Sequence, residues 1–91
     1  MEALTVAVLP ARIRAQLEPQ LPEWVEARWW QGPEDMMALA PAAEIGWFDL
    51  HEKGPPLAAI KAATNLRWLN TAYAGIDWLP LAELERREVA L

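Results

Sequence analysis

The fold of this chain is decided by residues 65–77, whose sequence is NLRWLNTAYAGID. Residues 66–71 have the apolar, β-favouring composition of a buried strand. Gly75 follows in a tight turn, and because it lacks a Cβ it tolerates a positive φ and the close approach of a ligand. Successive amides in such a turn form a concave site suited to a carboxylate. The stretch therefore predicts a strand that ends in an anion-binding turn, with an ordinary strand-to-helix turn as the alternative.

The rest of the chain alternates short apolar runs with segments of helical pattern. We expect further strands at residues 4–9, 24–30 and 43–50, and the start of a fifth strand at residues 89–91. Helices are expected to begin near Pro10, Gly32, Leu57 and Pro80. Within the last of these, Glu83 and Arg87 have the i,i+4 spacing of an ion pair.

This alternation predicts an α/β fold in which a parallel sheet carries helices on both faces. Residues 24–30 alternate between apolar and charged side chains, so one face of this strand is expected to be wet and the strand to lie at an edge. The pattern fits a flavodoxin-like open sheet of order 2-1-3-4-5, truncated at strand 5.

Composition allows one small domain with unusual apolar content. The 91 residues are 54% hydrophobic and include six tryptophans. Either the core is dense, or part of the apolar surface is meant for a partner domain. Five tryptophans fall in expected strands and are predicted to lie in the core, namely Trp24, Trp29, Trp30, Trp47 and Trp68, whereas Trp78 is the candidate for an exposed aromatic.

Charge and residue usage exclude several function classes. The net charge is −5 and no basic cluster is present, which argues against nucleic-acid binding. There is no cysteine and a single histidine, so thiol chemistry and a His- or Cys-based metal site are not expected. No signal peptide and no membrane-spanning stretch are evident, and a cytoplasmic location is expected.

Ligands of open α/β sheets bind beyond the carboxyl ends of the strands, which here are residues 9–11, 49–51 and 71–77. His51 titrates near neutral pH and could contact a substrate, although a lone loop histidine is more often simply solvated. Asp49 has the position of the phosphorylated aspartate in receiver domains. Such domains need an acidic pair after the first strand to hold magnesium, whereas residues 9–11 are Leu-Pro-Ala.

Residues 66–91 resemble the D-isomer-specific 2-hydroxyacid dehydrogenases. The similarity rests on a strand, the turn Tyr-Ala-Gly-Ile-Asp at residues 73–77, a leucine-rich helix and the short strand at residues 88–91. Residues 43–50 are similar to the family's third strand, and the layout is alike over nearly the whole chain. The turn is closest to that of the glyoxylate and hydroxypyruvate reductase branch.

The resemblance implies that the backbone amides of Ala74 and Gly75 bind a substrate carboxylate, and that Tyr73 and the loop near His51 line the substrate side of the cleft. In that family the catalytic residues and the NAD or NADP site belong to a second domain. Residues 1–91 would then be a single partial domain, with no catalytic residue, cofactor or metal of its own, and inactive alone.

The same resemblance implies several partners. The parent protein would act on a small 2-oxo or 2-hydroxy acid, would carry the NAD-binding domain and would form a homodimer. Its C-terminus would return to pack a helix on this first domain. One departure is local: Arg87 and Glu88 stand where the family's helix usually ends in glycine. The alternative to an enzyme is a non-enzymatic receiver or interaction domain of flavodoxin-like fold, with Asp49 as its switch.

Overall fold

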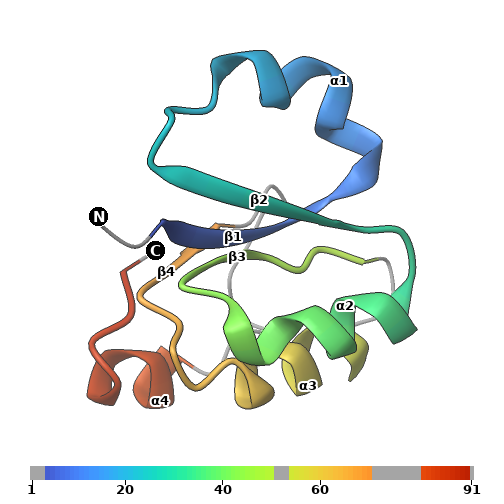
Figure 1. Ribbon diagram of the computed structural model, residues 1–91. Coiled ribbons are helices and arrows are strands. Elements are labelled where there is room, and N and C mark those ends of the chain that lie inside the picture. The colour runs from blue at the N-terminus through green and yellow to red at the C-terminus, as the bar shows by residue number, and fades with distance from the viewer. Residues whose placement is uncertain (1–3, 51–53, 71–80, 91) are drawn as a thin grey trace.

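The computed structural model describes residues 4–50, 54–70 and 81–90. It contains an all-parallel sheet in the order β2-β1-β3-β4 (Figure 1). The strands are β1 (Thr5–Pro10), β2 (Val25–Trp30), β3 (Ile45–Trp47) and β4 (Trp68–Asn70). The expected α/β class, the parallel strands and the edge position of the second strand are confirmed.

A parallel bridge continues the sheet beyond β4. Ala90 pairs with Trp68, the Leu69 N–H donates to the Ala90 carbonyl at 2.8 Å, and the Ala90 N–H donates to the Arg67 carbonyl at 2.9 Å. Because β3 occupies the other side of β4, residue 90 lies where a fifth strand of the predicted order would begin.

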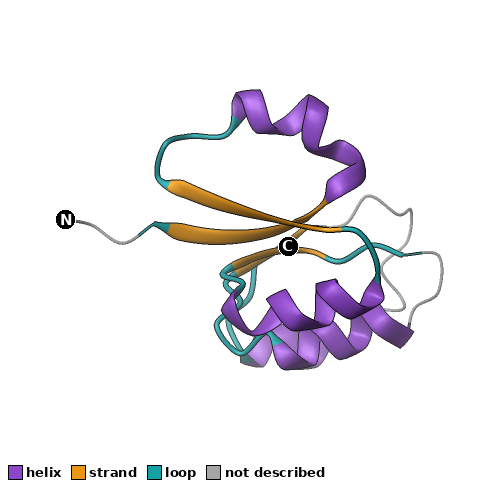
Figure 2. Cartoon of the chain, turned by 45° about the vertical axis from the view of Figure 1, so that its right-hand side comes forward, coloured by secondary structure: helices purple, strands orange, loops and turns teal. Residues whose placement is uncertain are grey.

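Helices cover the two faces of the sheet unequally (Figures 1 and 2). Between β1 and β2, residues 11–20 form a helical segment from η1 (Ala11–Ile13), α1 (Arg14–Leu17) and η2 (Glu18–Gln20), which lies on one face. The opposite face carries α2 (Pro33–Leu39) with η3 (Ala40–Ala42), α3 (Gly54–Ala62) and α4 (Leu81–Arg86).

The closed hydrophobic core lies between the sheet and the second set of helices. Strand and loop side chains from one face, such as Val8, Trp30 and Phe48, meet helical side chains such as Met36 and Ile60, all at most 1% exposed. Gly46 makes this packing possible, because a Cβ there would lie 2.6 Å from Cε2 of Phe48.

Among the described residues, the opposite face has no comparable core, and this corrects the prediction for the tryptophans. Trp30 is in the core, but Trp24 is 58% exposed and Trp68 is 49% exposed, while Trp29 and Trp47 are half-buried. Trp24 precedes β2, and Trp68 projects from β4 on the face where only the 11–20 segment packs among the described elements. The prediction that all five lie in the core is therefore wrong for these two.

The end of α4 also differs from the expected ion pair. The guanidinium of Arg87 donates to the carbonyl oxygens of Ile60 and Ala63 at the end of α3, rather than pairing with Glu83. The last carbonyls of a helix lack partners within it, and Arg87 supplies hydrogen bonds to two of them at the C-terminal end of α3.

Candidate functional site at the carboxyl edge of the sheet

The carboxyl ends of β1, β3 and β4 meet at one edge because the strands are parallel. The strand order changes direction between β1 and β3, and the crevice at such a switch point is where open α/β sheets bind ligands. Arg12 follows β1 and Asp49 follows β3. The Nη2 of Arg12 donates to the backbone carbonyl of Asp49 at 3.2 Å, so the two segments are joined across the crevice.

The guanidinium of Arg12 lies over the ring of Trp30. Its guanidinium carbon lies 5.5 Å from the ring centroid of Trp30, within the range of a cation–π interaction. Trp30 is itself fixed, because it is buried and its Nε1–H donates to the carbonyl of Trp47 at 2.8 Å. The Arg12 side chain is thus exposed to solvent yet held in one orientation.

Asp49 is buried at this edge, with 2% of its surface exposed. Its Oδ2 accepts a hydrogen bond from Nε1–H of Trp47 at 2.9 Å. A buried carboxylate is tolerated only when it is hydrogen-bonded, and the indole supplies one such bond. This environment favours a structural role for Asp49 and gives little access to a phosphoryl donor.

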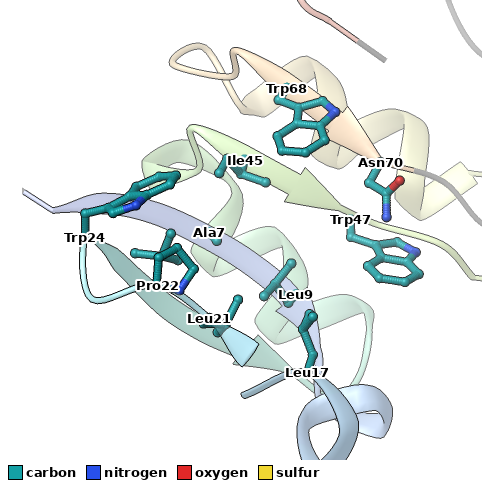
Figure 3. Close-up of a pocket in the computed structure, with 11 residues that line it drawn as sticks. Ala7, Leu9, Leu17, Leu21, Pro22, Trp24, Ile45, Trp47, Trp68 and Asn70 are labelled. Carbon is teal, nitrogen blue, oxygen red and sulfur yellow. The ribbon is translucent and has the colours of Figure 1, made fainter. Parts of the chain in front are cut away.

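An apolar groove opens on the sheet face that carries the 11–20 segment. Figure 3 shows Trp24, Trp47 and Trp68 around it, with Leu9 and Ile45 on its floor. Its volume is about 360 Å³, which is the size of a small-molecule site, and Asn70 supplies its polar side chain at the carboxyl end of β4. A smaller hollow of about 240 Å³ lies between the 11–20 segment and Trp47.

The site residues that the sequence pointed to lie outside the described residues. These are His51, Tyr73, Ala74 and Gly75, together with the turn residue Asp77 and with Trp78. The described residues that flank them are Asp49 and Leu50 on one side and Asn70 on the other. β4 ends at Asn70 on the carboxyl edge, directly before the glycine-containing sequence.

Two features of this edge were missed by the sequence reasoning. Arg12 was one residue beyond the strand end that was considered, and its partner carbonyl is 37 residues away in the sequence. The signal that could have found it is a basic residue two positions after a buried strand. The groove was missed because its tryptophans, Trp24, Trp47 and Trp68, were predicted to lie in the core.

Within residues 4–50, 54–70 and 81–90, no group of three or more His, Cys, Asp and Glu side chains could hold a metal ion. In the same ranges, no helix combines the length and the apolar character needed to cross a membrane. Comparison of the sequence with protein-family models and with curated proteins gave no significant match.

Proposed function

We propose that residues 1–91 are the N-terminal, substrate-binding part of an NAD(P)-dependent D-2-hydroxyacid dehydrogenase. The observation that carries the proposal is where the chain leaves β4. Asn70 ends this strand at the carboxyl edge, beside the β1/β3 switch point, and the sequence that follows contains Tyr-Ala-Gly-Ile-Asp at residues 73–77, which resembles the family's turn. The family-like sequence therefore begins shortly after a strand that ends at the ligand-binding edge of the fold, which supports the proposal.

In the proposed parent, a hydride passes between a nicotinamide and a 2-oxo acid. The backbone amides of Ala74 and Gly75 would hold the substrate carboxylate, and Tyr73 and His51 would line the cleft. The catalytic groups and the NAD or NADP site would come from a second domain. Residues 1–91 alone would bind no cofactor and turn over no substrate, and the parent would be a cytoplasmic homodimer.

The open groove supports the same proposal. Exposed tryptophans such as Trp24 and Trp68 are unusual on a free surface, since large apolar patches mark interaction sites. A helix returning from the C-terminus of the parent, as the resemblance implies, would cover this face. The groove would then be an internal packing surface of the whole enzyme.

The receiver-like alternative has less support. Its switch would be Asp49, but this carboxylate is buried and hydrogen-bonded to Trp47, and the described residues after β1 offer no acidic pair for magnesium. Binding of beryllofluoride in the presence of magnesium, seen as a change in the indole signals, would favour this alternative over the dehydrogenase.

The proposal is tested with the complete open reading frame that encodes these residues. We expect glyoxylate or hydroxypyruvate to be reduced with NADH or NADPH. Gly75→Val should lower kcat/KM by about 100-fold, because a side chain there would block the approach of the carboxylate to the amides. Gly54→Ala is the matched control, since a Cβ there would meet no atom within 4 Å. No turnover, or equal activity of the two variants, would contradict the proposal.

A further inference from the structure

We infer that Arg12 is the anion-binding residue of a site for a small carboxylate at the β1/β3 switch point. The site is formed by Arg12, the Asp49 carbonyl and the indoles of Trp30 and Trp47. The inference is argued from contacts among described residues and does not depend on the proposed dehydrogenase activity.

Arg12 has unused binding capacity. A guanidinium carries five N–H donors in a planar fork. One nitrogen donates to the carbonyl of Asp49, and no carboxylate in the described part of the chain lies within ion-pair distance of the group. The positive charge therefore remains available at the edge where ligands bind.

Arg14 has a similar indole contact to Arg12 and in addition an ion pair, so the two arginines can be compared directly. Arg14 lies over the ring of Trp29 at 5.6 Å, nearly the same geometry as Arg12 over Trp30. However, Nη2 of Arg14 pairs with Oε2 of Glu18 at 3.1 Å. Both guanidinium groups are supported by an indole, but among the described residues that of Arg14 has a carboxylate partner and that of Arg12 has none. In the inferred site the carboxylate of the ligand takes the place that Glu18 has beside Arg14.

The contacts of Arg12 also orient it for binding. The hydrogen bond to Asp49 and the stacking on buried Trp30 restrict the side chain before a ligand arrives. Less conformational freedom is then lost on binding, which is how preorganised sites gain affinity. The planar fork matches a carboxylate, which can accept two parallel hydrogen bonds.

The charges around the site favour a small monoanion. The chain has a net charge of −5, and the carboxylate of Asp49 belongs to the same hydrogen-bonded cluster. Both disfavour a phosphate dianion or a polyanion more than a single carboxylate. A hollow of about 240 Å³ lies on the neighbouring part of the same segment, lined by Ile13, Leu17 and Trp47 among others, and Arg12 is not part of its lining.

Titration of the ¹⁵N-labelled chain of residues 1–91 with pyruvate tests the inference, with chloride added to hold the ionic strength constant. The readouts are the indole N–H resonances of Trp30 and Trp47, since both indoles lie in the cluster. We expect a saturable shift of these two resonances with a dissociation constant in the millimolar range. Inorganic phosphate at the same ionic strength should bind at least about threefold more weakly.

Arg12→Gln should weaken pyruvate binding about tenfold or more, and Arg12→Lys should have an intermediate effect because it keeps the charge but loses the fork. Arg14→Gln is the matched control and should bind pyruvate as the parent chain does.

If Arg12→Gln does not fold, as judged by circular dichroism, the comparison of Arg12→Lys with Arg14→Gln decides. Absence of a saturable shift in the parent, tighter binding of phosphate, or equal loss in the Arg12 and Arg14 variants would overturn the inference. A lack of dehydrogenase activity in the complete protein would leave this titration unaffected, so the two proposals fail separately.

Discussion

Leu84 and Val89 join the C-terminal end of α4 to the core. The Val89 N–H donates to the Leu84 carbonyl at 2.9 Å, and both side chains are buried in the same cluster. Between them, the Glu88 N–H donates to the Glu85 carbonyl at 3.0 Å, and Glu88 itself has a φ of 58°. This is a Schellman motif in which glutamate occupies the left-handed position that usually belongs to glycine.

Glu88→Gly should therefore stabilise the chain by up to about 1 kcal/mol, because glycine adopts the left-handed conformation without steric cost. The free energy of unfolding in urea measures the effect. Glu85→Gly is the control within α4, and it should destabilise by roughly 0.5–1 kcal/mol as glycine does inside a helix. A loss of stability in both variants would contradict the role assigned to the Schellman motif.

Gly46→Ala should destabilise the chain by about 1–3 kcal/mol, the usual cost of overpacking a core. The added methyl group would meet the ring of Phe48 at 2.6 Å and Cδ1 of Leu66 at 3.0 Å. Gly54→Ala places a methyl group in open space and should change stability little. Equal urea midpoints for the two variants would show that β3 can shift away from Phe48.

The contribution of Asp35 to stability should depend on pH. Its carboxylate accepts hydrogen bonds from the backbone N–H groups of Gln31 at 2.7 Å and Gly32 at 2.8 Å, which lower the pKa of Asp35. Because the unfolded chain binds the proton more readily, this stabilisation is complete above the ordinary aspartate pKa of about 3.9 and is lost as pH falls through the lowered value.

The measurement is the unfolding free energy of the parent and of Asp35→Asn between pH 7 and pH 2. The parent should be the more stable at neutral pH, and the difference should shrink below about pH 4. Glu34→Gln, in the same first turn of α2, controls for the general attraction of the helix N-terminus for negative charge. A difference that stays constant down to pH 2 would exclude the hydrogen-bonded carboxylate as its source.

The tryptophans of the two sheet faces should differ in their contribution to stability. Trp30→Ala should cost about 3–5 kcal/mol, as expected for a buried aromatic side chain. Trp24→Ala should cost less than about 1 kcal/mol because most of this side chain is already in water. Similar losses in the two variants would mean that the groove contributes to the core after all.

The topology was predictable from the sequence because it depends on local periodicity. Alternation at residues 24–30 identified an edge strand, and the regular spacing of strands and helices predicted the parallel order. The environment of individual side chains was not predictable in the same way. The register of the strands puts Trp30 and Trp68 on opposite faces. Alternation in the sequence does not indicate which of these faces the described helices close.

Long-range contacts account for the other differences. The spacing of Glu83 and Arg87 suggested an ion pair, yet Arg87 binds carbonyls that lie 24 and 27 residues away in the sequence. The position of Arg12 has the same cause, since its orientation comes from Trp30 and from the carbonyl of Asp49. Such partners are set by the packing of the whole chain and leave no mark in a short window of sequence.

Among the described residues, the two faces of the sheet differ in how they are covered. The sheet and the helices α2, α3 and α4 are joined by buried side chains, whereas the 11–20 segment rests on the sheet beside an open groove. Arg12 belongs to the 11–20 segment and Asp49 follows β3, and their hydrogen bond joins the two. The contacts of Arg12 with the Asp49 carbonyl and the Trp30 ring are therefore where the 11–20 segment is tied to the rest of the chain at the carboxyl edge.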